Sequence, residues 1–438
     1  MRIERAALEQ SASAPGRGAG WSAPAAEEAG LPRFFGLARA AFVVFCIAIV
    51  LRVMIGDGIL NLVERYTSEG GSLIEKIHPA VYVMLLCGFV IYATVGLRFL
   101  PQERPEVRAF LMLAGLLALI GTINILVGRG SSAGYVIDSY ITTLLIAVLL
   151  YAMPHSWRGT VGLLVIGAIA FNSAFMMLEF GLGRTLVPAA MEAAEFRPAG
   201  FLGTPLTVGV LNLATAILVV SLPINTLIKA GTIALLVLGI LIAGARTAML
   251  LTSVVIPVAL VLAAWQRRSG MSAGVTAVTI LLVAIIAGPL IFVAANELGF
   301  LARFQSGYID DSAQTRIEIY RVFDYVSWKE ILFGSDLLTL KKIVNDKLGI
   351  QFIESAIVFF IFDFGLIGFI AFSILFGWLL YVLSRGSHIL LPLATLCFLG
   401  LALTNNTLAT KVPSLFAMLV MLIGVRAIHL RSDRGQLD

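Results

Sequence analysis

Four arginines are the side chains in this sequence whose type and placement best suit anion binding. Arg197 precedes a glycine- and proline-rich stretch, and Arg246 stands between two long apolar runs. Arg316 and Arg321 lie in the one long polar segment. A guanidinium keeps its charge and presents a planar fork that matches phosphate oxygens. Together on one face these arginines would bind an anionic ligand, whereas any one alone is also compatible with a side chain that snorkels to a membrane surface.

Two acids within an apolar run are candidates for proton transfer. Glu354 and Asp363 both fall in FIESAIVFFIFDFGLIGF, and ionisable groups within a membrane-spanning segment are functional candidates. Nine residues separate them, which at about 100° per residue puts them on opposite faces of a helix. Glu354 would share its face with Gly365 and Gly368, where another helix can approach. We therefore expect Glu354 to accept a hydroxyl proton, with a purely capping role as the alternative, and Asp363 to be structural.

The stretch RPAGFLGTPLTVGVL, residues 197–211, is unusual for the start of an apolar helix. Gly200, Gly203, Pro205 and Gly209 all weaken helix formation there. A helix that begins late at membrane depth is tolerated where it lines protein or a water-filled cavity, and its first N–H groups bind anions. Alternatively, the glycines serve close packing of neighbouring helices.

The histidines and cysteines give no pattern typical of a metal or redox site. The four histidines are scattered, and the three cysteines fall in apolar runs without metal-ligand spacing. These residues are His78, His155, His388 and His429, and Cys46, Cys87 and Cys397. We predict no metal and no cofactor, and we interpret the cysteines as packing residues.

The composition requires these residues to be positioned by membrane-spanning helices. Of 438 residues, 59% are hydrophobic and 13% are charged, with a mean hydropathy of +0.96, whereas soluble domains are roughly 25% charged. Apolar windows long enough to cross a bilayer predict about twelve spans. They cover 35–55, 79–99, 109–127, 136–153, 159–181, 200–222, 226–244, 246–265, 274–296, 354–383, 388–408 and 411–429. The predicted fold class is an all-α membrane helix bundle.

Lysine and arginine residues predict which side of the membrane each loop faces. With the termini inside, fifteen of them fall in inner segments and seven in the short outer loops, as the positive-inside rule favours. We therefore read the net charge of +5 as a topology signal and predict no nucleic-acid partner.

The predicted organisation follows from these spans. It comprises a disordered cytoplasmic tail over 1–33, nine spans over 34–296, an extracytoplasmic loop over 297–353, three spans over 354–430 and a short tail over 431–438. In the loop, helix-start patterns predict a helix over about 313–332, with Tyr320, Tyr325 and Trp328 at the membrane interface, and a shorter helix that ends at Gly349.

Several of these short motifs, in this order, resemble the O-antigen ligase and Wzy-type polysaccharide polymerase superfamily. They are Arg197-Pro-Ala-Gly-Phe with Thr204-Pro205, Gly-Ala-Arg246-Thr-Ala, Arg316 followed by Tyr320 and by Leu332-Phe333-Gly334, and Glu354 before Gly365-Leu-Ile-Gly368. The resemblance covers about 195–370 and the plan of about twelve spans with a large outer loop between spans nine and ten.

The resemblance implies a metal-independent glycosyltransferase in the bacterial cytoplasmic membrane. Such an enzyme transfers a glycan from an undecaprenyl-diphosphate carrier to an acceptor hydroxyl on the outer face. Arg197, Arg246, Arg316 and Arg321 would bind the diphosphate, Arg197 and Arg246 would stabilise its developing charge, and Glu354 would orient or deprotonate the acceptor. The implied partners are the lipid-linked oligosaccharide, a flippase and a chain-length regulator.

One departure bears on which reaction is expected. Ligases of this family usually carry a histidine where this chain has Glu354, and His-Pro is common where it has Thr204-Pro205. This favours a polymerase, for an exopolysaccharide or O-antigen, over a ligase that acts on a lipid A core.

Two further classes stay open. A secondary transporter fits about twelve spans with an interrupted span six. Against it, the charges cluster at one side of the membrane, and the large loop after span nine does not fit two halves of six spans each. A binding or scaffold protein without chemistry is the other alternative.

Overall fold

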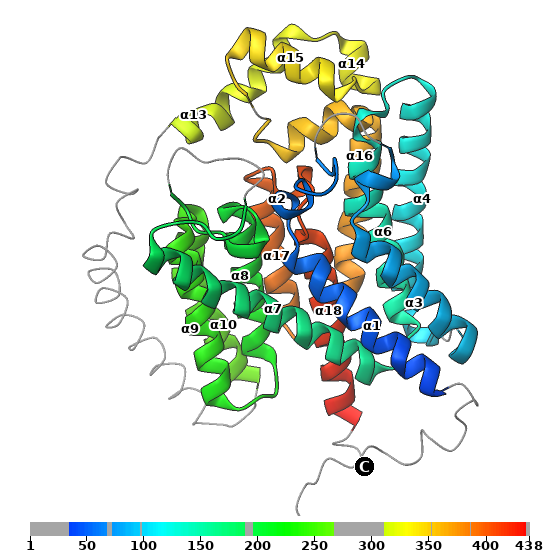
Figure 1. Cartoon of the computed structure of the whole chain (residues 1–438), viewed down its shortest axis with the longest axis vertical. Coiled ribbons are helices and arrows are strands. Elements are labelled where there is room, and N and C mark those ends of the chain that lie inside the picture. Colours follow the sequence, from blue (N-terminus) through cyan, green and yellow to red (C-terminus); the bar gives the residue numbers. More distant parts are fainter. Residues whose placement is uncertain are drawn as a thin grey trace, which may run out of the picture.

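The computed structural model is all-helical over the residues it describes, as predicted (Figure 1). Those residues are 35–67, 72–96, 99–188, 196–266, 311–351, 353–385 and 387–434. The predicted tail over 1–33, the predicted span over 274–296 and the start of the predicted loop lie outside them.

Within the described residues, eight helical segments are long and apolar enough to cross a membrane. They lie in α1 (Phe35–Met54), α4 (Arg104–Leu126), the run Gly130–Tyr151 that ends with α6 (Thr142–Tyr151), α7 (His155–Leu182), α9 (Thr226–Ala243), α10 (Arg246–Gln266), α16 (Ala356–Ser384) and α18 (Ser414–Arg434). Three shorter apolar helices, α3 (Pro79–Val95), α8 (Pro205–Ser221) and α17 (Leu390–Leu403), occupy other predicted spans. The described residues therefore contain the helices of a membrane protein, with eight candidate spans, and the number of about twelve for the whole chain stays a prediction.

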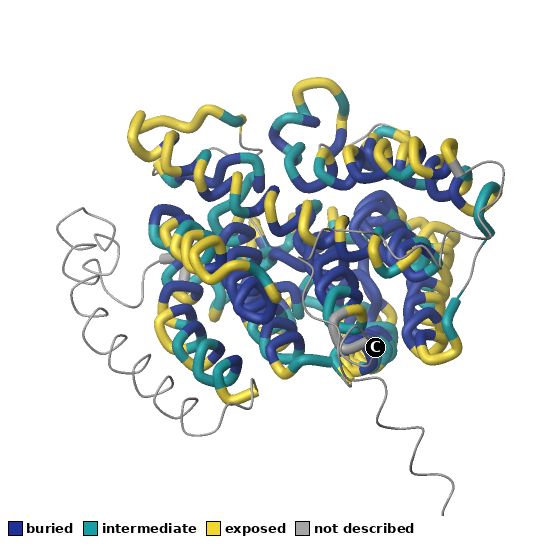
Figure 2. Tube along the Cα trace, turned by 90° about the horizontal axis from the view of Figure 1, so that it is seen from below, coloured by how far each residue is buried: buried dark blue, intermediate teal, exposed yellow. Residues whose placement is uncertain are grey.

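Helix α8 is the central helix of the bundle. It is mostly apolar and is buried from Thr207 to Ser221, as expected for a helix surrounded by others. Its neighbours include α7, α9, α10, α17 and α18, and buried residues form the interior of the Cα trace (Figure 2). The start of α8 is therefore fixed by packing on several sides.

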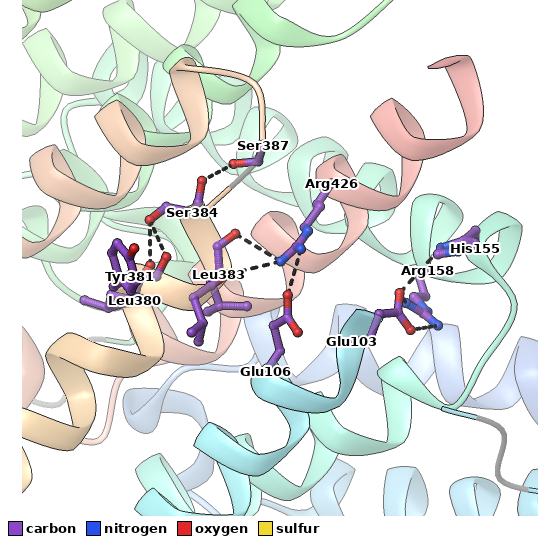
Figure 3. Close-up of polar contacts among 11 residues, drawn as sticks. Glu103, Glu106, His155, Arg158, Leu380, Tyr381, Leu383, Ser384, Ser387 and Arg426 are labelled. Atoms are coloured by element: carbon purple, nitrogen blue, oxygen red, sulfur yellow. Dashed lines mark hydrogen bonds and ion pairs between the residues drawn. The ribbon is translucent and has the colours of Figure 1, made fainter. Parts of the chain in front are cut away.

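Buried ion pairs join the helices at one end of the bundle (Figure 3). Both terminal nitrogens of Arg158 donate to Glu103, at 2.6 and 3.1 Å. Arg426 lies 2.7 Å from the Glu106 carboxylate and also donates to the carbonyl of Val382. Because an unpaired charge in a bundle is costly, these pairs fix the register of α4, α7, α16 and α18.

A second buried polar network closes the opposite end. The Asp138 carboxylate accepts hydrogen bonds from Arg52 at 2.8 Å, from the Tyr66 hydroxyl at 2.6 Å and from the His78 backbone N–H at 2.8 Å. Burial lowers the pKa of Lys411, which donates to the Tyr66 carbonyl beside this network, to about 8. This network thereby holds together the end of α1, the loop before α3 and the loop before α18.

Short helices cover this second end of the bundle, at the top of Figure 1. They are α13 (Asp311–Glu318), the 3₁₀ segment η6 (Ile319–Tyr325), α14 (Trp328–Phe333) and α15 (Leu337–Leu348). The prediction of one helix over 313–332 is wrong, because the backbone is extended at Val326 and Ser327 starts a new helix through a capping box with Glu330. The predicted end at Gly349 is confirmed, since this residue is left-handed at φ 66°.

A kink at Gly365 joins these short helices to the bundle. Gly365 has φ 72° and ψ 157° within α16, a conformation accessible essentially to glycine alone. A Cβ there would lie 2.5 Å from the Leu332 carbonyl oxygen. The Ser335 N–H donates to the Phe362 carbonyl at 2.7 Å, and Arg129 donates to the Phe333 carbonyl at 2.9 Å. The Leu332-Phe333-Gly334 motif therefore docks onto the kink.

Gly365→Ala should loosen this joint. The backbone conformation alone would cost about 1–3 kcal/mol, and the close Leu332 carbonyl adds to it. We expect a lower midpoint of thermal unfolding in detergent and faster proteolysis within 311–351. Gly377→Ala is the matched control, because a Cβ there on the same helix meets nothing within 4 Å. Equal behaviour of the two variants would contradict the joint.

Candidate functional site

Glu354 lies next to an arginine on the helices that cover the bundle. Its Oε2 is 3.2 Å from Nε of Arg316 in α13, and each side chain is 30% exposed. Helix α16 begins at Ala356, so Glu354 stands just before the helix and not within a span. The expectation that Glu354 shares a helical face with Gly365 is therefore wrong. The geometry instead gives a partly open carboxylate paired with a cation.

Ser355, the residue after Glu354, forms hydrogen bonds with two different elements. Its Oγ accepts a hydrogen bond from the Val358 N–H at 3.3 Å and so caps α16. The same Oγ lies 3.3 Å from the Tyr320 hydroxyl of η6. The position of Glu354 is thus tied both to the bundle and to the covering helices.

Asp363 is buried deeper in α16 and has a different environment. It is 3% exposed, and its Oδ1 accepts a hydrogen bond from the Ser132 hydroxyl at 2.5 Å. Its backbone carbonyl accepts from Asn124 of α4 at 2.8 Å. These bonds connect the kinked helix to its neighbours, which supports the structural role predicted for this acid.

Arg197 lies against the turn that leads to Arg246. The Arg197 guanidinium donates to the carbonyl of Ala243, at 3.2 Å from Nη2, and to that of Gly244 at 3.4 Å. Gly244 is left-handed at φ 63° and ends α9, and α10 begins at Arg246. The predicted tight turn is therefore present. A cation at the end of a helix also complements its exposed carbonyls.

The predicted arginines thus occur in two groups. Arg197 lies at the turn that carries the partly buried Arg246, while Arg316 pairs with Glu354. Arg321 lies on the exposed surface of η6. In Figure 1, α13 lies above the upper ends of α8, α9 and α10. Both groups are therefore at the same end of the molecule.

Two buried polar residues of α7, which were not predicted as site residues, hold the segment that carries Arg197. Glu179 accepts from the N–H of Gly200 at 3.0 Å and from that of Leu186 at 2.8 Å. Asn172 accepts from the Phe201 N–H at 2.7 Å. Both side chains are fully buried. The sequence does indicate these two residues, because polar residues seven positions apart share one face of a membrane-spanning helix.

The two interpretations of the glycines after Arg197 apply to different residues. Gly200 and Gly203 have φ of 55° and 79°, and α8 starts only at Pro205 with Thr204 as its cap. The late helix start is therefore confirmed. At Gly209, by contrast, a Cβ would lie 2.9 Å from the Cβ atoms of Ala245 and Ala248. This glycine serves close packing of α8 against α10.

Comparisons with models of protein families, with curated proteins and with solved structures found no match to this chain. Within the described part of the chain, no group of three His, Cys, Asp or Glu side chains is arranged to hold a metal ion.

Glu179→Leu should release the segment over 196–204. The substitution leaves backbone N–H groups of a buried region without acceptors, at about 1–3 kcal/mol for each group. We expect amide hydrogen exchange in 196–204 to accelerate by about tenfold or more. Thr160→Val on the same helix is the control, because its hydroxyl bonds only to the Ser156 carbonyl one turn away. Unchanged exchange in the Glu179 variant would show that packing alone holds the segment.

Proposed function

We propose that this protein is an integral-membrane glycan polymerase. It transfers a glycan from an undecaprenyl-diphosphate carrier to the hydroxyl of a lipid-linked repeat unit at the outer face of the bacterial cytoplasmic membrane. The observation that carries the proposal is that Arg197 is fixed against the turn that begins α10 with Arg246, at the end of the bundle covered by the Arg316 and Glu354 pair.

The proposal includes a membrane topology of about twelve spans with both termini cytoplasmic. The helices of the described residues overlap eleven of the twelve predicted spans. The excess of lysine and arginine in the segments assigned to the inside supports this orientation. In it, α13, η6, α14 and α15 belong to the large loop outside, where Trp328 is exposed and suits the membrane interface.

Two arginines at the end of a helix pair suit a lipid diphosphate. Arg246 is the first residue of α10, and Arg197 contacts the last carbonyls of α9. The ends of spanning helices lie near headgroup depth, where a lipid diphosphate presents its charge. A turn between two packed helices holds a guanidinium more rigidly than a long loop would.

The proposed reaction is a displacement at the anomeric carbon of the donor sugar. The acceptor oxygen forms a bond to that carbon while the bond from carbon to the diphosphate oxygen breaks. The leaving diphosphate takes the electron pair, and Arg197, Arg246 and Arg316 stabilise its charge. The hydroxyl proton passes to Glu354. Arg316, at 3.2 Å from Glu354, links the acceptor side to the diphosphate side, and Arg321 adds positive charge nearby.

A secondary transporter is the second candidate, and the kink of α16 favours it. Broken helices and buried acids are typical of transport paths, and Asp363 lies two residues before the break at Gly365. The Ser335 N–H and the Asn124 side chain, however, already donate to the carbonyls of Phe362 and Asp363 before this kink, which gives the break a structural reason.

Arg246→Ala should abolish chain elongation. We expect lipid-linked glycans from the native host to stay at single repeat units, as after gene deletion, with normal membrane levels of the variant. Arg246→Lys should restore little, because an ammonium lacks the fork of a guanidinium. Arg184→Ala, which removes an exposed arginine next to α7, is the control. Long lipid-linked chains that never reach a final acceptor would indicate a ligase, and an unchanged profile would reject both and favour transport.

Glu354→Gln should slow transfer without weakening carrier binding. Loss of a general base lowers the rate by about 10²- to 10⁴-fold, whereas the arginines still bind the diphosphate. The measurement is kcat for elongation of a purified lipid-linked repeat, together with the Kd for the carrier. Asp346→Asn is the control, because it neutralises an exposed acid of the covering helix α15 and leaves Glu354 and its neighbours in place. Full activity of Glu354→Gln would remove Glu354 from the mechanism.

A further inference from the structure

An apolar groove runs between α1 and α7. It has a volume of about 540 Å³, within the range of sites that bind small molecules. Its walls include Val50 and Met54 of α1 and Leu163, Leu164, Gly167 and Phe171 of α7. Both helices are candidate membrane spans, so the groove faces the hydrocarbon phase.

The lining of the groove suits a hydrocarbon chain. Thr160 is the one wall residue with a polar side-chain atom, and its hydroxyl donates to the Ser156 carbonyl of the same helix at 3.0 Å. Gly167 opens the wall, because a Cβ there would meet nothing within 4 Å. No wall residue therefore demands a polar partner from the occupant.

The outer end of the groove meets the segment that carries Arg197. Phe171 stacks on Phe201, with ring centroids 6.2 Å apart. Gly56, two residues beyond Met54, packs so closely on the Phe201 carbonyl oxygen that a Cβ there would lie at 2.9 Å. The segment from Arg197 to Phe201 thus connects the groove to the turn before Arg246.

We propose that this groove binds the isoprenoid chain of the lipid-linked substrate. This inference rests on the proposed function and adds the site of the lipid tail. A chain along α7 would leave the groove beside Phe201, where the segment over 197–203 leads its diphosphate toward Arg197. Hydrocarbon packing in the groove then increases affinity for a long-chain carrier, while the arginines bind the diphosphate.

The test compares two diphosphates that differ in chain length. The full-length protein in phospholipid nanodiscs is titrated with undecaprenyl diphosphate and with farnesyl diphosphate. We expect wild type to bind the long chain at least about tenfold more tightly, since each buried methylene adds affinity. Gly167→Leu, which fills the groove, should remove this preference and leave the Kd for farnesyl diphosphate unchanged.

The control and the remaining outcomes separate this inference from the proposed function. Gly115→Leu places the same side chain in open space at an exposed position of α4 and should keep the long-chain preference. Equal long-chain preference in wild type and Gly167→Leu would overturn the groove while leaving the proposed function intact. Failure of wild type to bind either diphosphate would overturn the proposed function, and the groove assignment with it.

Discussion

The whole arrangement depends on satisfying backbone groups where the chain leaves helical geometry inside an apolar bundle. Hydrocarbon offers no hydrogen bonds, so each such group needs a partner from the protein. Around residues 197–204, Glu179 and Asn172 supply acceptors for backbone N–H groups that have no helical partner. At the end of α9, Arg197 supplies donors for exposed carbonyls. The residues that satisfy the backbone are therefore also the ones that place a guanidinium at the proposed diphosphate site.

The same constraint explains why α16 can break at Gly365. Ser335 donates to the Phe362 carbonyl and Asn124 to the Asp363 carbonyl, and both carbonyls precede the break. The carbonyls at the break thereby keep hydrogen-bond donors, and the end of α14 packs against the break. Since Glu354 precedes the same helix and Arg316 precedes η6, the joint also determines where the carboxylate and its arginine lie relative to the bundle.

Sequence patterns predicted features that depend on neighbouring residues. The turn at Gly244 and the helix end at Gly349 follow from glycine and from the apolar pattern around each one. The apolar run predicts a span from residue 354, but α16 begins only at Ala356, because the apolar pattern starts before the helix. The cap at Ser327 lies within a helical pattern that continues across it, so the pattern predicts one helix where there are two. These errors arise where hydrophobicity continues across a change of backbone conformation.

Long-range partners could not be predicted in this way. Nothing near Glu103 in sequence indicates Arg158, and nothing near Arg52 indicates Asp138, yet both pairs are buried. The Arg316 and Glu354 pair likewise joins positions 38 residues apart. Candidate arginines were identified from their chemistry, but their division into two groups follows from which elements carry them. Arg197 lies in the segment that leads into α8, Arg246 begins α10, which packs against α8, and Arg316 belongs to the covering helix α13. A reaction that needs both groups would therefore require the covering helices to hold the acceptor above a diphosphate bound to the bundle.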